Sequence, residues 1–363
     1  MELIDEIKKA KKEIVADGYE MSVGEIMNLY KDNELIINPA FQRLFRWSIT
    51  QKTRFIESLL LGIPIPPIFV YQNDDGLWEL IDGLQRLSTI FEFAGVLRDE
   101  NNKLKPPLCL EGTQFLPGLN EIQWDPPNSI GKENQLEIKR ARIRVEILKK
   151  ESDPAAKYEL FQRLNTGGSN LSEQEVRNCV AIMLNKDFYD WLKSCAQHVA
   201  FRKTIDQTAR ALERQSDMEL ALRFFAFRNL KYEGGVGVHE YLDKALYKMA
   251  TNSNFSYKSE KSVFEDTFSM LNQYLGNKTF KRWDGNKFTG KFLMSTFEVI
   301  ATGISKSMTH VKSLKEIDKK KFVIDKIKSL WGNPKFEKYS GAGISGTTRL
   351  DKLLPLAERY FEK

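Results

Sequence analysis

The first 150 residues change their apolar spacing from one segment to the next, and the changes predict strands mixed with helices. Residues 66–72 and 77–81 are short runs rich in Ile, Val, Tyr and Trp, and they flank the turn sequence Asn-Asp-Asp-Gly. This pattern predicts a β-hairpin. Helical spacing follows at once and predicts a helix over residues 84–94, whose buried face holds these residues: Leu87, Ile90, Phe91 and Ala94.

Capping signals mark three further helix starts. Ser22, Ser48 and Ser172 are each followed three residues later by Glu or Gln, as in a capping box. The helix after Ser48 is predicted to end at Gly62. Two more strands are predicted: a short one in ELIINP at residues 34–39, and one over residues 140–147 with these residues on one face: Ala141, Ile143, Val145 and Ile147.

The domain organisation follows from where these patterns stop. Residues 98–137 carry prolines and glycines with little periodicity, so we expect a long irregular insertion there. From Leu171 onward helical spacing dominates, with breaks at the glycines near residues 234–237, 276 and 341–346. The expected fold class is α+β, with an α+β domain at residues 1–170 and a mostly helical domain at residues 171–363.

Composition sets limits on the function. Lys and Arg total 55 against 49 Asp and Glu, and the net charge of +6 permits a polyanionic partner such as DNA without requiring one. The three histidines have no metal-ligand spacing, which argues against zinc enzymes and HNH-type nucleases. No apolar run is long enough to cross a membrane. Cys109, Cys179 and Cys195 are scattered, so we expect a reducing cytoplasm.

The segment Leu80–Ile90, LIDGLQRLSTI, places an acid, a glycine and an arginine where the hairpin gives way to the helix. Gly83 lets the backbone approach a ligand closely, and the first N–H groups of a helix favour an anion. Arg86 can grip phosphate oxygens as a fork. Asp82 is a candidate to hold magnesium, orient water or cap the helix. The alternative is a structural turn in which Asp82 caps the helix and Arg86 pairs with it.

Arginines interleaved with aromatic residues precede this corner. Arg43 and Arg46 lie three residues apart, beside the following rings: Phe41, Phe45 and Trp47. The mixture suits phosphate binding with base stacking. Core packing of the rings, with the arginines reaching solvent, explains it as well.

Two loops in the second half of the chain are further candidates for anion binding. Asn165–Gly168 (Asn-Thr-Gly-Gly) can offer backbone N–H groups as a nest, with Arg163 beside it and Glu175 and Arg177 following. Near the end of the chain, residues 340–352 carry a similar glycine-rich set: Ser345, Thr347 and Arg349. Glu175 has a simpler interpretation as part of the Ser172 capping box.

One face of the strand at residues 140–147 is basic. Arg142 and Arg144 point away from its apolar side chains. They are either solvated charges or part of a basic groove.

Four segments occur in the order typical of one family: PAFQRLFRW, SLLLGIPIPPIFVY, IDGLQRLSTI and FQRLNTGGSNLSEQEVRN. Together they resemble the GmrSD-type, ParB-like N-terminal domain of bacterial anti-phage restriction systems, over roughly residues 20–250. The resemblance implies a ParB/sulfiredoxin-like fold that binds nucleotide phosphates through a Gly-x-x-Arg turn. It also implies binding or hydrolysis of a nucleoside triphosphate, which regulates DNA cutting by an HNH nuclease.

The resemblance assigns roles to single residues. Asp82, Gln85 and Arg86 would carry the catalysis, with Asp82 also holding Mg²⁺. Gly83 would bind the triphosphate together with these residues: Arg43, Arg46, Arg163 and Asn165. The family signature is Asp-Gly-Gln-Gln-Arg, and here Leu84 replaces its first glutamine, which leaves phosphate binding credible and puts hydrolysis in doubt.

The resemblance leaves two other functions open. The chain has no histidine-rich nuclease motif, so a separate nuclease chain would have to cut the DNA. The first alternative is a DNA-binding or sensor module without catalysis, and the second is a ParB-like DNA nickase. The base of the nucleotide and the oligomeric state do not follow from the sequence.

Overall fold

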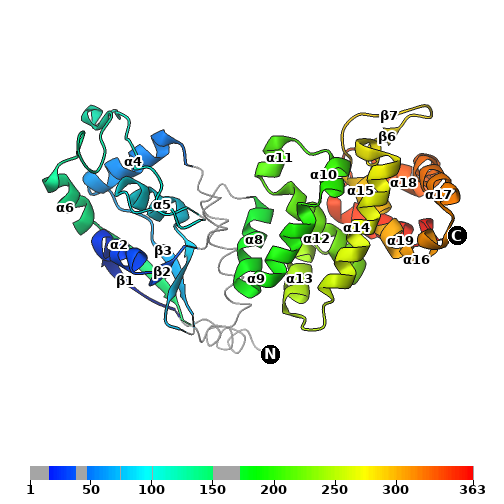
Figure 1. The fold of residues 1–363 in the computed structure, drawn as a ribbon, viewed down its shortest axis with the longest axis horizontal. Helices are drawn as coiled ribbons and strands as arrows, with labels where there is room; N and C mark the ends of the chain where they lie inside the picture. The colour runs from blue at the N-terminus through cyan, green and yellow to red at the C-terminus, as the bar shows by residue number, and fades with distance from the viewer. Residues whose placement is uncertain (1–15, 38–46, 74, 100, 150–171, 363) are drawn as a thin grey trace. The chain divides into compact units, whose positions relative to one another are not determined.

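The computed structural model of the chain describes residues 16–37, 47–73, 75–99, 101–149 and 172–362. They divide into two compact units, with the division between residues 169 and 170. The first unit contains a mixed sheet and the second is mainly helical (Figure 1). The expected α+β class is therefore confirmed at this level, while likeness to the ParB/sulfiredoxin fold stays a prediction.

The sheet of the first unit has the strand order β1-β5-β3-β4-β2. Its strands are β1 (Ala16–Ser22), β2 (Leu35–Ile36), β3 (Ile68–Gln72), β4 (Trp78–Asp82) and β5 (Arg142–Leu148). β3 and β4 pair antiparallel, which confirms the predicted hairpin. β5 lies between β1, to which it is antiparallel, and β3, to which it is parallel.

Helices cover one face of this sheet. They are α2 (Val23–Lys31), α4 (Ile49–Leu60), α5 (Leu84–Phe93) and α6 (Lys132–Arg140). Their apolar residues form one core with the inward-facing side chains of β3, β4 and β5. Ser48 forms the predicted capping box with Gln51, and Ser22 accepts a hydrogen bond from the amide of Glu25. These local contacts fix where α4 and α2 begin.

Helix α6 corrects the expectation that residues 98–137 are irregular throughout. It begins directly after Gly131 and is strongly polar, with Ile138 as its buried residue. A helix with a single buried position shows almost no apolar periodicity, so the pattern did not reveal it. A short 3-10 helix, η1 (Pro117–Leu119), also lies in this segment.

The second unit is built from α8 (Glu173–Leu184), α9 (Lys186–Ala196), α10 (Val199–Ile205), α11 (Ala209–Glu213), α12 (Ser216–Asn229), α13 (Val238–Thr251), α14 (Tyr257–Tyr274), α15 (Met294–Lys306), α16 (Met308–Ser313), α17 (Glu316–Ser329), α18 (Pro334–Ser340) and α19 (Gly346–Tyr360). Two 3-10 helices, η2 (Gly276–Lys278) and η3 (Leu330–Gly332), join them. A small hairpin, β6 (Arg282–Trp283) with β7 (Phe288–Thr289), interrupts the helices. Ser172 forms the predicted capping box with Glu175 at the start of α8.

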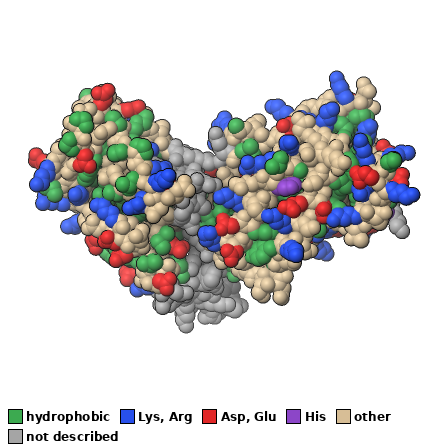
Figure 2. Space-filling view, in the orientation of Figure 1, with side chains coloured by type: hydrophobic (Ala, Val, Ile, Leu, Met, Phe, Trp, Pro, Cys, Tyr) green, Lys and Arg blue, Asp and Glu red, His purple; other side chains and the backbone are tan. Residues whose placement is uncertain are grey.

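Aromatic packing forms much of the core of the second unit. Neighbouring ring centroids lie 4.6 to 5.4 Å apart among these fully buried residues: Phe201, Phe224, Phe225, Phe264 and Phe268. Such edge and offset contacts add to the free energy gained by burying apolar area. On the described surface, charged side chains of both signs are interspersed (Figure 2). Among the described helices, none combines the length and apolar character needed to cross a membrane.

The cysteines give a direct test of this packing. Cys195 of α9 is buried, and burial raises the pKa of its thiol to about 12. Cys109 is exposed. Because the thiolate is the reactive form, we expect iodoacetamide at pH 8 to modify Cys109 in the folded protein and to leave Cys195 unmodified until denaturant is added. Peptide mass spectrometry would measure this, and rapid labelling of Cys195 in the native protein would contradict the packing.

Candidate functional site

The corner between β4 and α5 has a backbone conformation that requires glycine. Gly83 has a φ of +104° and is the N-cap residue of α5. A Cβ atom at this position would lie 2.5 Å from Cγ2 of Ile68. No side chain caps the helix start. The first turn of α5 therefore begins at a tight corner with no side-chain oxygen over its amides, a geometry suited to an anion.

Asp82 and Arg86 pair across this corner. The Nη2 atom of Arg86 donates to Oδ2 of Asp82 at 2.7 Å, and Nη1 donates to the carbonyl oxygen of Pro66 at 3.0 Å. The exposed fractions of the two side chains are 13% for Arg86 and 26% for Asp82. The pairing expected in the structural alternative is therefore present. The helix cap proposed for Asp82 is wrong, because the cap position belongs to Gly83.

Gln85 connects the corner to the segment that precedes α4. Its Oε1 atom accepts a hydrogen bond from the backbone N–H of Trp47 at 3.1 Å. The ring of Trp47 packs on Phe55, with centroids 5.5 Å apart. Trp47 directly follows Arg46 in sequence, so the chain passes the corner at this point. Arg43, Arg46, Arg163 and Asn165 themselves lie outside the described residues, and their assignment stays a prediction.

The corner supplies one carboxylate for a metal ion, that of Asp82. Among the described residues, no group of three or more His, Cys, Asp or Glu side chains is close enough to hold a metal ion. Mg²⁺ in nucleotide sites is commonly bound by one or two carboxylates, with phosphate oxygens and water completing the shell. The donor set fits Mg²⁺ brought by a triphosphate and does not resemble a metal cage made only of protein.

A cavity of about 450 Å³ lies elsewhere in the first unit. Its lining includes Leu60 and Leu61 at the end of α4, and Phe115, Leu119 and Ile130 of the insertion. The lining includes none of the predicted site residues and no Lys or Arg side chain. It therefore offers no cation to a phosphate.

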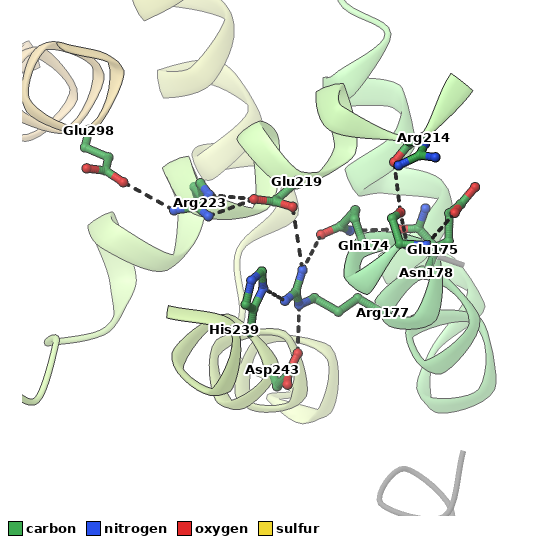
Figure 3. A network of polar contacts seen from close by, with 11 residues as sticks. Gln174, Glu175, Arg177, Asn178, Arg214, Glu219, Arg223, His239, Asp243 and Glu298 are labelled. Carbon is green, nitrogen blue, oxygen red and sulfur yellow. Dashed lines mark hydrogen bonds and ion pairs between the residues drawn. The ribbon is translucent and has the colours of Figure 1, made fainter. Parts of the chain in front are cut away.

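Arg177 was expected beside the Asn165–Gly168 loop as part of an anion site, but the structure places it in a buried network. It belongs to α8 and has an exposed side-chain fraction of 1%. Its Nε atom donates to Asp243 at 2.7 Å, and its Nη1 donates to Gln174 at 3.1 Å. Its Nη2 lies 2.7 Å from Nδ1 of His239 (Figure 3). Because arginine only donates, a hydrogen bond between these two atoms requires Nδ1 of His239 to accept.

The network continues through α12 to α15 and α19. Arg223 donates to Glu219 at 2.7 Å and to Glu298 at 3.3 Å. Glu298, fully buried, also accepts two hydrogen bonds from Arg349, at 2.7 and 3.0 Å. Burial acts to raise the pKa of Glu219, but the guanidinium groups of Arg223 and Arg177 outweigh it and hold the pKa below its ordinary value.

This network corrects the expectation for the glycine-rich loop near the C-terminus. Arg349 is engaged with Glu298, and the Ser345 hydroxyl accepts from the amide of Thr348 as the cap of α19. These two residues therefore stabilise the helical unit. The network is not evident in the sequence because most of its links join helices far apart in the chain; the Glu219–Arg223 and Gln174–Arg177 pairs do have helical spacing. On the strand face, Arg144 pairs with Glu146 at 2.5 Å, which favours solvated charges there.

Comparison with known proteins gives one match. Residues 23–182 match the sequence model of the family described as GmrSD restriction endonuclease, N-terminal domain. No curated protein and no solved structure matches the chain.

Proposed function

Because residues 23–182 are a GmrSD-type restriction endonuclease N-terminal domain, we propose that the chain binds a nucleoside triphosphate at the Gly83 corner and thereby regulates the restriction of DNA in an anti-phage system. The family match points to a restriction component that acts on DNA. The nucleotide, its hydrolysis and a separate nuclease chain are our proposal.

The observation that carries the proposal is the backbone at Gly83. A positive φ together with a Cβ position filled by Ile68 means that no other residue fits without strain. Glycine at such a corner also lets the backbone approach a ligand closely. Here the corner ends in a helix start without a side-chain cap, so the N–H groups of the first turn can face phosphate oxygens.

Arg86 and Asp82 would then exchange partners on binding. Phosphate oxygens would take the place of the Asp82 carboxylate on the guanidinium of Arg86, and the released carboxylate would be a ligand for Mg²⁺. Bound Mg²⁺ would neutralise charge on the phosphates. Until then, the salt bridge keeps Arg86 folded back against the corner, since Pro66 also accepts from it.

Hydrolysis would need a group that orients water. Gln85 and Asp82 are the candidates on the described corner, with Gln85 held in place by Trp47. Leu84 offers no polar atom where the family signature has a glutamine. This substitution favours the second candidate function, a DNA-binding sensor that grips phosphate without hydrolysing a nucleotide.

The test is nucleotide binding and phosphate release with Mg²⁺, measured for the wild type, Arg86→Ala and Arg86→Lys. We expect Arg86→Ala to weaken binding by about 10- to 100-fold, because a charge-assisted hydrogen bond contributes about 1.5–3 kcal/mol. Arg86→Lys keeps the charge without the fork and should recover part of the loss.

Arg54→Ala is the matched control, because Arg54 is an exposed arginine on α4 in the same unit. Equal binding by wild type and Arg86→Ala would place the site elsewhere. A wild type that neither binds nor hydrolyses any nucleoside triphosphate would end the proposal. Binding without phosphate release would favour the sensor.

A further inference from the structure

Positive charge is concentrated in one part of the second unit, outside the matched family domain. Residues 278–338 contain fifteen Lys and Arg and six Asp and Glu, a net charge of +9. The whole chain has a net charge of +6, so the remaining residues sum to −3. An asymmetry of this size between parts of one chain is typical of contact with a polyanion.

The β6–β7 hairpin and α17 share one surface. Trp283 is opposite Phe288 in the hairpin, and their ring centroids lie 4.9 Å apart. The Nζ atom of Lys328 lies over the Trp283 ring at 4.5 Å from its centroid. This cation–π contact and the ring packing fix the hairpin beside α17. Figure 2 shows basic side chains at the end of the second unit that carries these elements.

Acids lie near two lysines of this surface without forming a direct ion pair with them: Asp284 lies near Lys287, and Glu316 lies near Lys320. Lys287 lies in the turn of the hairpin, and Lys320 and Lys321 lie on α17; all three are exposed. Among the described residues, none of the three has a carboxylate within ion-pair distance. Elsewhere in the unit, exposed lysines do pair along their helices, as Lys186 does with Asp190 and Lys244 with Glu240.

Adjacent lysines repel one another. Helix α17 carries three exposed acids, Glu316, Asp318 and Asp325. Each of Lys320, Lys321 and Lys328 has one of these acids three or four positions away on the helix. The positive excess of the surface therefore comes from the net charge of residues 278–338 as a whole.

We propose that this surface, defined as the β6–β7 hairpin with Lys320, Lys321 and Lys328 of α17, binds the phosphate backbone of duplex DNA. Lysine ammonium groups bind phosphate as point charges, so the contact would not depend on sequence. A two-stranded ribbon beside a helix offers cations from two elements to the same backbone. The choice of DNA over other polyanions rests on the proposed restriction function. The excess of positive charge is an observation on the sequence and does not depend on that proposal.

The test is fluorescence anisotropy of a labelled random-sequence duplex, titrated between about 50 and 200 mM salt without nucleotide. The test variant is Lys287→Glu with Lys320→Glu and Lys321→Glu. We expect binding at least roughly tenfold weaker, and a slope of log K against log salt that is smaller by about 3, because each lysine would neutralise one phosphate.

The matched control variant replaces Lys203, Lys248 and Lys258 with glutamate. These are exposed lysines on α10, α13 and α14 of the same unit. Either triple change takes the net charge from +6 to 0, so the two variants differ only in where the replaced lysines lie. Equal loss in both variants, no binding by the wild type, or tighter binding to phosphatidylserine vesicles or RNA than to the duplex would overturn the proposal. A test variant that fails to fold is replaced by the corresponding Lys→Gln triple.

Nucleotide binding, measured on the same samples, separates this proposal from the previous one. The Lys→Glu test variant should bind nucleotide as the wild type does, because none of its changes lies in the first unit. Arg86→Ala should retain nucleotide-independent binding to the duplex. If the wild type binds nucleotide but not the duplex, the proposal for this surface fails. If it binds the duplex but no nucleotide, the proposal for the Gly83 corner fails.

Discussion

Replacing Arg177 with alanine is expected to lower the free energy of unfolding of the helical unit by about 3–5 kcal/mol. The change removes the cation that faces Asp243 and leaves that buried carboxylate without its partner on α8. It also removes one of the two guanidinium groups that pair with Glu219 among the described residues and leaves the pair with Arg223. Removing one partner of a buried ion pair is far more costly than losing one hydrogen bond at the surface, because water does not replace the missing partner of the buried charge.

Native-state hydrogen exchange of peptides from α8, α12 and α13 would measure this destabilisation, since it reports the local free energy of opening. Lys244→Ala is the control, because it breaks the exposed pair with Glu240 on α13; its cost should be at most about 1 kcal/mol. A similarly small cost for Arg177→Ala would mean that the network around Asp243 stays solvated.

The parts of the fold that the sequence predicted are those set by neighbours in the chain. The capping boxes at Ser48 and Ser172 and the turn before Gly76 depend on residues only a few positions apart. Spacing alone therefore identifies them. The family resemblance was found in the same way. Its four segments were identified from their sequences alone, without any knowledge of how they pack.

Pairings between distant segments could not be predicted in this way. Residue Ala16 pairs with Leu148, and β5 enters the sheet between strands from the first part of the chain. The Arg177 network likewise joins residues more than 60 positions apart. Such contacts are chosen by burial and geometry in three dimensions, and nothing in local spacing records them.

The candidate site was predictable in part. The sequence identified Gly83 as a backbone position with a special role, and its positive φ agrees with that interpretation. The sequence could not decide whether Arg86 binds Asp82 or a ligand, because an i,i+4 acid–arginine pair is consistent with both. In the structure, Arg86 pairs with Asp82.

The family match and the compact units do not end at the same residue. The match runs to residue 182, whereas the division between the units lies at residues 169 and 170. Most of helix α8, up to residue 182, therefore lies in the matched segment and also in the helical unit, where Arg177 contacts α13. A segment cut at residue 182 would retain Arg177 and lose Asp243, so the matched region depends on the rest of the chain for its last helix.

Replacing Gly83 with alanine is expected to destabilise the first unit by roughly 2–6 kcal/mol, from backbone strain of about 1–3 kcal/mol and overpacking of a similar size. The strain arises from a φ of +104°, and the overpacking from the 2.5 Å approach of the new Cβ to Ile68. These two causes can be separated, because Ile68→Ala removes the clashing methyl group and leaves the backbone angle as it is.

A double-mutant cycle on Gly83 and Ile68 therefore tests the geometry of the corner. Ile68 is buried, so Ile68→Ala alone should cost about 2–5 kcal/mol. The double variant should cost less than the sum of the two single variants, by about 1–3 kcal/mol, because the closest contact, to Cγ2, is removed, while Cβ of residue 68 stays 3.0 Å from the new Cβ. Hydrogen exchange of α5 peptides would measure each state. Strict additivity would mean that no contact between the two positions constrains the corner.

The backbone strain is expected to persist in the double variant and to keep nucleotide binding weak. The reason is that the backbone angle at Gly83, and not the side chain of Ile68, sets the direction of the amides in the first turn.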